Sequence, residues 1–489
     1  MALWAAPESG AQTSRQALST IFRHEVGQTV RGLRFAVASL LLVAVMAFAA
    51  ISGGARYRSA WLEQQAVSQA YAAQLSGVTI DRAAEILHPS TKTPWHLSAV
   101  VDGGQTATPD LCEQALSAQV APVVRHLTLG NSRLPARQPL DWMFVLRVLL
   151  PLLAFLLGYD TVCGERKAGI LKLLLSYPVA RSKVLAGKLL ALWTCLAVPL
   201  VLGAALNLGL ARTVGAIPFT AADLGKALLV LLLGLWAALF FALVALLVST
   251  ISSDASLSLS VLTWLWVTGV IVAPAVSGLF AQRLRPIPTA EEIRQRLAAV
   301  DMRVARQYAG HEGHWRRPEW AKADGFAWEK VSAAAENQRA AEREEVRRGV
   351  LLQKIQQARL AQQLAAISPA SLTDLLGEQV AGAGRERDES FLHQAWRFRD
   401  KLARSVAILD SEDPASPHVL FFSGYLSRRP LPAISATGAP GLPRFAFREI
   451  SIRQGLGTAR SGLAFFAAET LALAAAAFYS FSRFAAGDR

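Results

Sequence analysis

Histidine and cysteine are the residues through which this 489-residue chain could bind a metal or exchange electrons. The run His311-Glu312-Gly313-His314 differs from the HExxH pattern of zinc hydrolases, because its second histidine comes one position too early. Gly313 also weakens the helix that would have to direct both imidazole rings at one ion. We therefore predict a solvated turn there and no metal site. The cysteines are odd in number and lack CxxC spacing, so no disulfide framework is predicted: Cys112, Cys163 and Cys195.

ATP chemistry would require a phosphate-binding loop of the form Gly-x-x-x-x-Gly-Lys-Ser/Thr. The two Gly-Lys pairs, at residues 187–188 and 225–226, are followed by Leu189 and Ala227 instead. The signature LSGGQ of one large class of ATPases does not occur in the sequence either. The chain is therefore expected to be non-catalytic and to bind no cofactor of its own.

The composition is typical of a membrane protein. Hydrophobic residues make up 53% of the chain, and the mean hydropathy is positive. The formal net charge of +14 would suggest nucleic-acid binding if lysine and arginine formed one solvated patch. They lie instead in blocks between apolar runs, which membrane topology explains. We therefore predict a lipid bilayer as a partner, and no nucleic acid.

Apolar segments long enough to cross a bilayer recur along the chain. The hydrocarbon core of roughly 30 Å takes about 20 helical residues. We predict an all-α polytopic membrane protein with six transmembrane helices. The predicted spans are residues 33–51, 142–157, 185–210, 227–248, 257–280 and 462–481.

Lysine and arginine near the ends of the spans set the orientation, because such residues stay on the cytoplasmic side. The leader at 1–32, the stretch between the second and third spans, and the tail at 482–489 all carry them. We predict that these parts, and so both termini, are cytoplasmic in a bacterial inner membrane. Two large segments, 52–141 and 281–459, are then expected to face the periplasm. The basic residues are Arg15, Arg23, Arg31, Arg34, Arg166, Lys167, Lys172, Arg181, Lys183, Lys188, Arg483 and Arg489.

The larger of these outer segments has a helical pattern. Apolar residues recur at helical spacing over 327–367, which predicts one long amphipathic helix. The pair Ser368 and Pro369 ends it, and a shorter helix is expected to follow. A third helix is predicted over 386–409. Several prolines then predict a loop over 410–444.

Two ionisable residues interrupt the apolar spans. Arg147 lies in the second span and Glu469 in the sixth, and burying either charge alone would be costly. Counting about 1.5 Å per residue from the outer ends of their helices places both at similar depth in the outer half of the membrane. We predict a structural ion pair between them, with a role in transport as the alternative.

The segment 151–188 carries the most informative pattern in the chain. A span ends, and Glu165 and Arg166 follow in a polar turn. The next apolar run, 170–175, is too short to cross a membrane and is interrupted by a lysine. These features predict a short amphipathic helix on the cytoplasmic surface, within residues 158–184.

This segment resembles the type-2 ABC permease family (ABC-2 type), whose members share a Glu-Arg-x-x-Gly-x-Leu-x-x-Leu-Leu-x-x-Pro-x-x-Arg pattern followed by Gly-Lys. In that family the segment is the coupling helix, which sits in a groove of an ATPase and passes its movement to the spans. Ile170 departs from the small polar residues that are common at its position. The stretches 21–35 and 367–402 also resemble a subgroup with a large outer helical domain of uncharacterised function. The matching residues are Glu165, Arg166, Gly169, Leu171, Leu174, Leu175, Pro178, Arg181, Gly187 and Lys188.

The resemblance implies the permease subunit of an exporter that works by alternating access. A separate ABC ATPase dimer would bind ATP and Mg, and a second permease chain, identical or homologous, would complete the path. The implied contact with the ATPase has charged residues at its rim and leucines at its packed centre. It comprises Glu165, Arg166, Gly169, Leu171, Leu174, Leu175, Pro178 and Arg181.

A competing interpretation is that nothing crosses the membrane. The chain would then transmit the ATPase cycle to its large outer domain, which would act on a periplasmic or outer-membrane partner. The size of that domain, unusual for a simple channel wall, favours this alternative. A membrane-anchored sensor is a weaker third interpretation, because sensors do not need a coupling helix.

Overall fold

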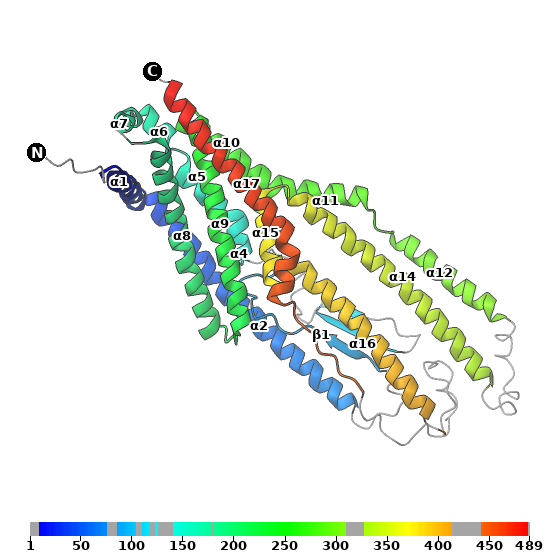
Figure 1. The fold of residues 1–489 in the computed structure, drawn as a ribbon. Coiled ribbons are helices and arrows are strands. Elements are labelled where there is room, and N and C mark those ends of the chain that lie inside the picture. Colours follow the sequence, from blue (N-terminus) through cyan, green and yellow to red (C-terminus); the bar gives the residue numbers. More distant parts are fainter. Residues whose placement is uncertain are drawn as a thin grey trace, which may run out of the picture.

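The fold is a bundle of long helices that continues into a helical domain at one end (Figure 1). Helix α1 and the C-terminal end of α17 lie at the other end of the bundle, which we call the proximal end; the opposite end is distal. The predicted turn at 311–314, Pro178 and most of the predicted loop at 410–444 lie outside the described residues. The computed structural model describes residues 9–75, 86–103, 110–116, 123–125, 140–177, 179–309, 327–412, 414 and 442–487.

Six helical segments of the described chain are long and apolar enough to span a membrane. Each predicted span lies inside one of them, so the predicted all-α polytopic fold is confirmed. The segments are α2 (Leu33–Leu75), the second span (Trp142–Lys167), α8 (Arg181–Thr213), α9 (Ala221–Ile251), the fifth span (Ala255–Leu284) and α17 (Ile452–Gly487).

The second and fifth spans each contain a π-helical turn. Such a turn holds an extra residue and is frequent at functional sites. The second span consists of α4 (Trp142–Phe144), the π-helical turn η2 (Val145–Leu149), α5 (Leu150–Gly158) and α6 (Cys163–Lys167). The fifth consists of α10 (Ala255–Val267), the π-helical turn η3 (Thr268–Val272) and α11 (Ala273–Leu284).

Polar side chains determine where two of the spans begin. Thr220 and Asp223 form a capping box at the start of α9, in which each side chain accepts a hydrogen bond from the backbone amide of the other residue. Asp254 accepts from the amides of Ser256 and Leu257 and so caps α10. Since a bilayer offers no water to unpaired amides, these caps supply partners that the first turn of each helix lacks.

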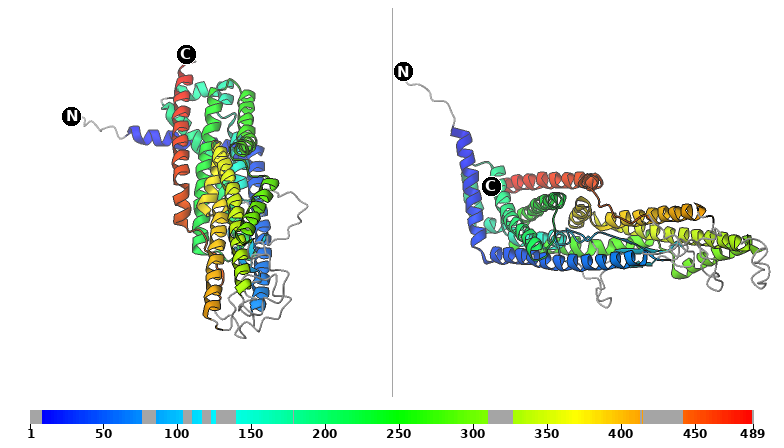
Figure 2. Two further views of the ribbon diagram at one scale, coloured as in Figure 1. Left: turned by 90° about the vertical axis from the view of Figure 1, so that its right-hand side faces the viewer. Right: turned by 90° about the horizontal axis from the view of Figure 1, so that it is seen from below.

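Helix α1 (Ser9–Arg31) lies across the proximal end of the bundle, at a steep angle to the spans (Figure 2). Gly32 separates it from α2 and breaks the continuity of the two helices. The short helix α7 (Ile170–Ser176) lies at the same end, between α6 and α8 in the chain. The proximal end therefore carries two helices that do not span.

The distal domain combines the far part of α2 with three long helices and a small sheet (Figure 1). The helices are α12 (Ala290–Gln307), α14 (Ala327–Ala365) and α16 (Gly384–Glu412), and α14 confirms the long helix predicted over 327–367. The antiparallel sheet has the order β1 (His88–Thr91), β2 (Leu111–Gln114), β3 (Val123–Arg125), with His88 opposite Gln114. The sequence analysis did not predict this sheet.

Helix α15 (Pro369–Ala381) packs into the bundle, although the sequence analysis assigned it to the outer domain. Leu372 and Leu376 are buried in the same core as the spans. Ser368 donates a hydrogen bond to the carbonyl oxygen of Gly269 in η3 at 2.8 Å. A helix of 13 residues is too short to span, but its apolar face is buried when it packs between spans.

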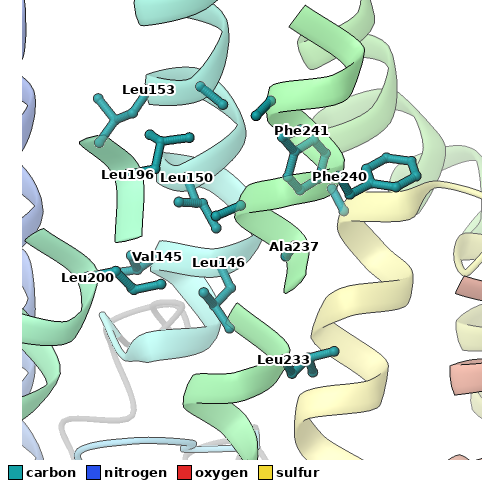
Figure 3. Packing of buried hydrophobic residues seen from close by; sticks show 14 of the residues in the cluster. Val145, Leu146, Leu150, Leu153, Leu196, Leu200, Leu233, Ala237, Phe240 and Phe241 are labelled. Carbon is teal, nitrogen blue, oxygen red and sulfur yellow. The ribbon is translucent and has the colours of Figure 1, made fainter. Parts of the chain in front are cut away.

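The core of the bundle depends on close approach between α5, α8 and α9. A Cβ atom added at Gly158 would lie 2.7 Å from the Cβ of Ala245 and 2.9 Å from a methyl carbon of Leu192. No side chain fits there without separating α5 from its neighbours. Figure 3 shows the adjoining apolar side chains: Val145, Leu146, Leu150, Leu153, Leu196, Leu200, Leu233, Ala237, Phe240 and Phe241.

Gly158→Val should therefore destabilise the bundle by about 1–3 kcal/mol, the usual cost of overpacking a core. The measurement is the midpoint of thermal unfolding of the purified protein in detergent. Gly278→Val in α11 is the matched control, because nothing lies within 4 Å of the Cβ position there. Equal midpoints for the two variants would contradict the packing described for α5.

Candidate functional site

The segment that carries the coupling motif forms two short helices joined at Gly169. Gly169 has φ +76°, a conformation that side chains with a Cβ rarely adopt, so glycine permits the corner between α6 and α7. At the start of α6, the hydroxyl oxygen of Ser249 accepts hydrogen bonds from the amides of Val162 and Cys163 at 3.0 and 3.3 Å. The start of α6 is thus attached to the end of α9.

Helix α7 has apolar residues on two faces. Leu171 is only 6% exposed, and Leu174 and Leu175 pack against the core of the bundle. Leu171 therefore lies inside the protein and is not placed to form the centre of a contact with another protein, whereas for the half-buried Leu174 and Leu175 this stays a prediction. The outward face carries Ile170 and Leu173, which are 53% and 65% exposed, and Tyr177, directly after the helix, is 60% exposed.

Glu165 faces the interior of the protein and not a solvent-exposed rim. Its Oε1 atom lies 2.6 Å from the Nζ atom of Lys188 in α8, and Lys188 also lies 2.5 Å from Glu25 of α1. The side chain of Lys188 is completely buried. The prediction for Glu165 is corrected accordingly: a buried ammonium needs carboxylate partners, and Glu165 supplies one.

Two arginines of the motif bind carbonyl oxygens at the ends of other spans. Arg166 donates to the carbonyls of Thr250 and Ser252, at 2.7 and 3.4 Å, where α9 ends. Arg181 donates to the carbonyl of Ser482, near the end of α17, at 2.9 Å. Cations are favoured at helix C-termini, where carbonyls lack intrahelical partners. Both arginines therefore link the motif to the bundle.

The intramembrane ion pair predicted between Arg147 and Glu469 is wrong. Arg147, in η2, donates to Asp374 of α15 at 2.9 Å. The Oε2 atom of Glu469 is buried and has no hydrogen-bond partner among the described residues. Depth in the membrane, on which the prediction depended, does not determine which face of a helix a side chain occupies.

Several carboxyl groups lie near the distal end of η2. Burial raises the pKa of Asp141 to about 7, even though the amides of Asp102 and Phe144 donate to it. Burial, together with the nearby Asp374 and Asp141, raises the pKa of Glu378 to about 8. Glu378 lines an open cavity of about 280 Å³, so solvent protons reach it. In the part of the chain that the structure describes, no three such groups are placed to hold a metal ion.

Comparison with known proteins identifies the family. A family model described as "ABC-2 family transporter protein" matches residues 19–484. The chain belongs to this family. Two curated relatives, each described as probable ABC transporter permease protein NosY, are 46% identical (Pseudomonas aeruginosa) and 44% identical (Stutzerimonas stutzeri) over 55 residues. That stretch is 11% of this chain and 20% of each relative, so the chain matches about a fifth of their length.

The ABC-2 motif of this chain therefore has an internal and an external side. Its charged residues hold α6 against the ends of α8 and α9 and hold the start of α8 against α17, whereas the exposed apolar side chains of α7 face outward. This outward face was not predicted from the sequence, although Ile170, Leu173 and Tyr177 recur at a spacing of three and four residues. Ile170, at a position where small polar residues are common in the family, was the sequence feature that could have indicated this face.

The raised pKa of Glu378 predicts a pH dependence of stability. The unfolded chain loses this proton near the usual glutamate pKa of about 4.3, whereas the folded protein keeps it up to about pH 8. Stability is therefore lost as the pH rises through this window, because the unfolded state binds fewer protons there. Glu378→Gln should flatten this loss, so that the variant unfolds at a higher temperature than the unmodified protein above pH 8.

Thermal midpoints measured in detergent from about pH 5 to 9 test this prediction. The matched control is Glu412→Gln at the end of α16, where the side chain is exposed. An unchanged slope in the Glu378→Gln variant would mean that this carboxyl ionises normally in the folded protein.

Proposed function

We propose that this chain is the membrane-spanning permease subunit of an exporter driven by a separate ABC ATPase. The observation that carries the proposal is the exposed apolar face of α7, formed by Ile170 and Leu173 and followed by the exposed Tyr177, beside a motif bound to several spans. Burying a leucine-sized side chain contributes roughly 1.5–3 kcal/mol, so three such residues supply a strong centre for a protein contact. Proteins rarely leave such residues clustered at a polar surface without a partner.

The proposed mechanism starts with ATP binding by the partner, which brings two ATPase subunits together. Their closure displaces α7, and the corner at Gly169 passes the displacement to α6. Glu165 then acts on α8 through Lys188, Arg166 acts on the end of α9, and Arg181 acts on the end of α17. Three spans receive the movement together, and a path between two permease chains opens outward.

We assign the proximal end to the cytoplasm and the distal domain to the periplasm. The basic residues at the proximal end support this orientation, because lysine and arginine in short loops stay inside. Lys167 and Lys172 are exposed beside the apolar face of α7. These two lysines place positive charge at the edge of the apolar face of α7, and this charge attracts an acidic surface of the partner.

A second candidate function, transmission without transport, is favoured by the continuity of α2. This helix of 43 residues is about 64 Å long, twice the thickness of a hydrocarbon core, and reaches far into the distal domain. A second link is the hydrogen bond that Lys226 in α9 donates to the carbonyl of Ile450, at 2.8 Å. This bond connects α9 to the segment that leads from the distal domain into α17. ATP-dependent accumulation of a solute in vesicles that contain the complex would support transport; movement of the distal domain without accumulation would support transmission.

Leu173→Asp should reduce recovery of the ATPase with this chain about tenfold or more, because it removes apolar contact area and would bury a charge in the contact. The measurement is copurification from membranes in mild detergent, with the bound ATPase identified and quantified by mass spectrometry. The unmodified chain should bring down an ABC ATPase in fixed stoichiometry.

Leu352→Asp in α14 is the control, since this leucine is 37% exposed in the distal domain and lies far from α7. Equal recovery with both variants would exclude α7 as the docking surface. Recovery of no ATPase with the unmodified chain would reject the permease proposal itself.

A further inference from the structure

A polar cavity lies where four helices meet, at the junction of the distal domain with the bundle. Helices α14, α15 and α16 and the first turns of α17 form its walls, and its volume is about 280 Å³. Apart from Leu375 and Ala383, every side chain that lines it is polar or charged. Such a lining favours a small polar ligand that forms several hydrogen bonds over an apolar one.

Close packing holds two walls of this cavity in place. A Cβ atom added at Gly455 of α17 would lie 2.5 Å from the carbonyl oxygen of Gln379 in α15, so the backbones of these helices are in direct contact. Gly384, at the start of α16, has φ +63°, and a Cβ atom there would lie 2.6 Å from Oε2 of Glu378. Glycine is therefore needed beside this carboxyl group. The surrounding backbone thus sets the position of Glu378 in the cavity.

A glutamine amide lies between opposite charges inside the cavity. The Oε1 atom of Gln362 accepts a hydrogen bond from Nε of Arg385 at 3.0 Å, and its Nε2 atom donates to Oε2 of Glu378 at 3.4 Å. Arginine can only donate, so the amide oxygen must face Arg385 and the amide NH₂ group must face Glu378. A neutral group therefore bridges a cation and a carboxyl group.

Arg385 and Glu378 form no ion pair with any residue that the structure describes, although both side chains are half-buried. In the same cavity, by contrast, Arg359 pairs with Glu389. Removing a charge from water without an opposite charge beside it is unfavourable. Arg385 and Glu378 can therefore each gain from a ligand that supplies the opposite charge.

We propose that this cavity binds a small zwitterion with the charge pattern of an α-amino acid. The carboxylate of the ligand replaces the amide oxygen at Arg385, and its ammonium group replaces the amide NH₂ group at Glu378. The flexible side chain of Gln362 turns out of the cavity to admit it. Each replacement exchanges a hydrogen bond to a neutral amide for one between charged groups, which is roughly twice as strong.

A metal ion matches this cavity less well than a zwitterion. Among the described residues, no three histidine, cysteine or carboxylate side chains are placed to hold one ion. Arg385 cannot bind a metal ion either, since a guanidinium group has no acceptor to offer. The mixture of donors and acceptors therefore favours an organic ligand over an inorganic cation.

The proton of Glu378 gives binding a measurable signature. Burial raises the pKa of Glu378 to about 8, and the nearby Asp374, Asp141 and Asp388 also raise it, whereas Arg385 lowers it. Below this pH the carboxyl group keeps its proton. An ammonium group beside the carboxyl favours the ionised form and lowers the pKa. Binding at about pH 7 therefore releases a proton.

Isothermal titration calorimetry of the purified chain in detergent, at about pH 7, tests the proposal. The probes are L-alanine, L-serine and L-glutamine, and we expect at least one of them to bind with a Kd of about 1 mM or lower. L-Lactate lacks the ammonium group and L-alaninamide lacks the carboxylate, so each should bind about tenfold more weakly or less. Titrations in two buffers of different ionisation enthalpy measure the released proton. Since the chain is titrated alone, the result does not depend on whether an ATPase drives it.

Variants of the two charged residues locate the binding. Arg385→Gln and Glu378→Gln should each weaken it about tenfold or more, and Glu378→Gln should also abolish the release of the proton. Arg385→Lys keeps the charge and should bind more tightly than Arg385→Gln. The matched controls are Arg404→Gln and Glu412→Gln at exposed positions of α16, which should bind like the unmodified chain. The thermal midpoint of each variant shows whether it is folded.

Failure of all three amino acids to bind would overturn the proposal, as would binding that both Arg385→Gln and Glu378→Gln leave unchanged. Equal binding of L-lactate and the amino acids would show an anion site and contradict the role given to Glu378. Binding without release of a proton would contradict contact between the ammonium group of the ligand and this carboxyl.

Discussion

A charge beside a lipid bilayer must be neutralised by the protein, because little water is available to solvate it. At the proximal end this requirement decides how the helices are joined. Lys188 takes two carboxylates from different helices, and Arg166 and Arg181 take carbonyl oxygens at the ends of α9 and α17. The basic residues at this end therefore connect the spans to one another.

The distal side of the bundle meets this requirement in another way. Arg147 neutralises Asp374, but Asp141 and Glu378 lie nearby, and burial raises the pKa of both. Burial there lets a carboxyl keep its proton to a higher pH than usual. The two ends of the bundle thus differ: paired charges join helices at the proximal end, and protons contribute to neutrality at the distal end.

The spans and the long distal helix could be predicted from the sequence because their signals are local. An apolar run of sufficient length identifies a span, and a repeated apolar spacing identified α14 almost to its ends. Which side of a helix is buried could not be predicted, because burial depends on tertiary packing. Helix α7 is apolar on both sides, so nothing local distinguishes the buried Leu171 from the exposed Leu173. The three short strands were missed because each has only three or four residues.

The partner of Arg147 shows the same limit over a longer range. Two charges at one depth suggested a pair with Glu469, whereas Asp374 lies 227 positions away in a helix too short to suggest a place in the membrane. The ABC-2 motif was recognisable from its residues, yet the inward role of its charged side chains needed Glu25 and the carbonyls at the ends of two other helices. A pattern of one segment contains no information about the segments that receive its hydrogen bonds.

The position of α15 between the two π-helical turns restricts how such a chain can vary in length. Arg147 in η2 binds Asp374, and Gly269 in η3 accepts a hydrogen bond from Ser368, so both turns contact one short helix. Deleting a single residue from η2 would rotate Arg147 by about 100° relative to α5 and remove it from its carboxylate. The second span therefore has a fixed length at this turn, because its register decides whether Arg147 reaches Asp374.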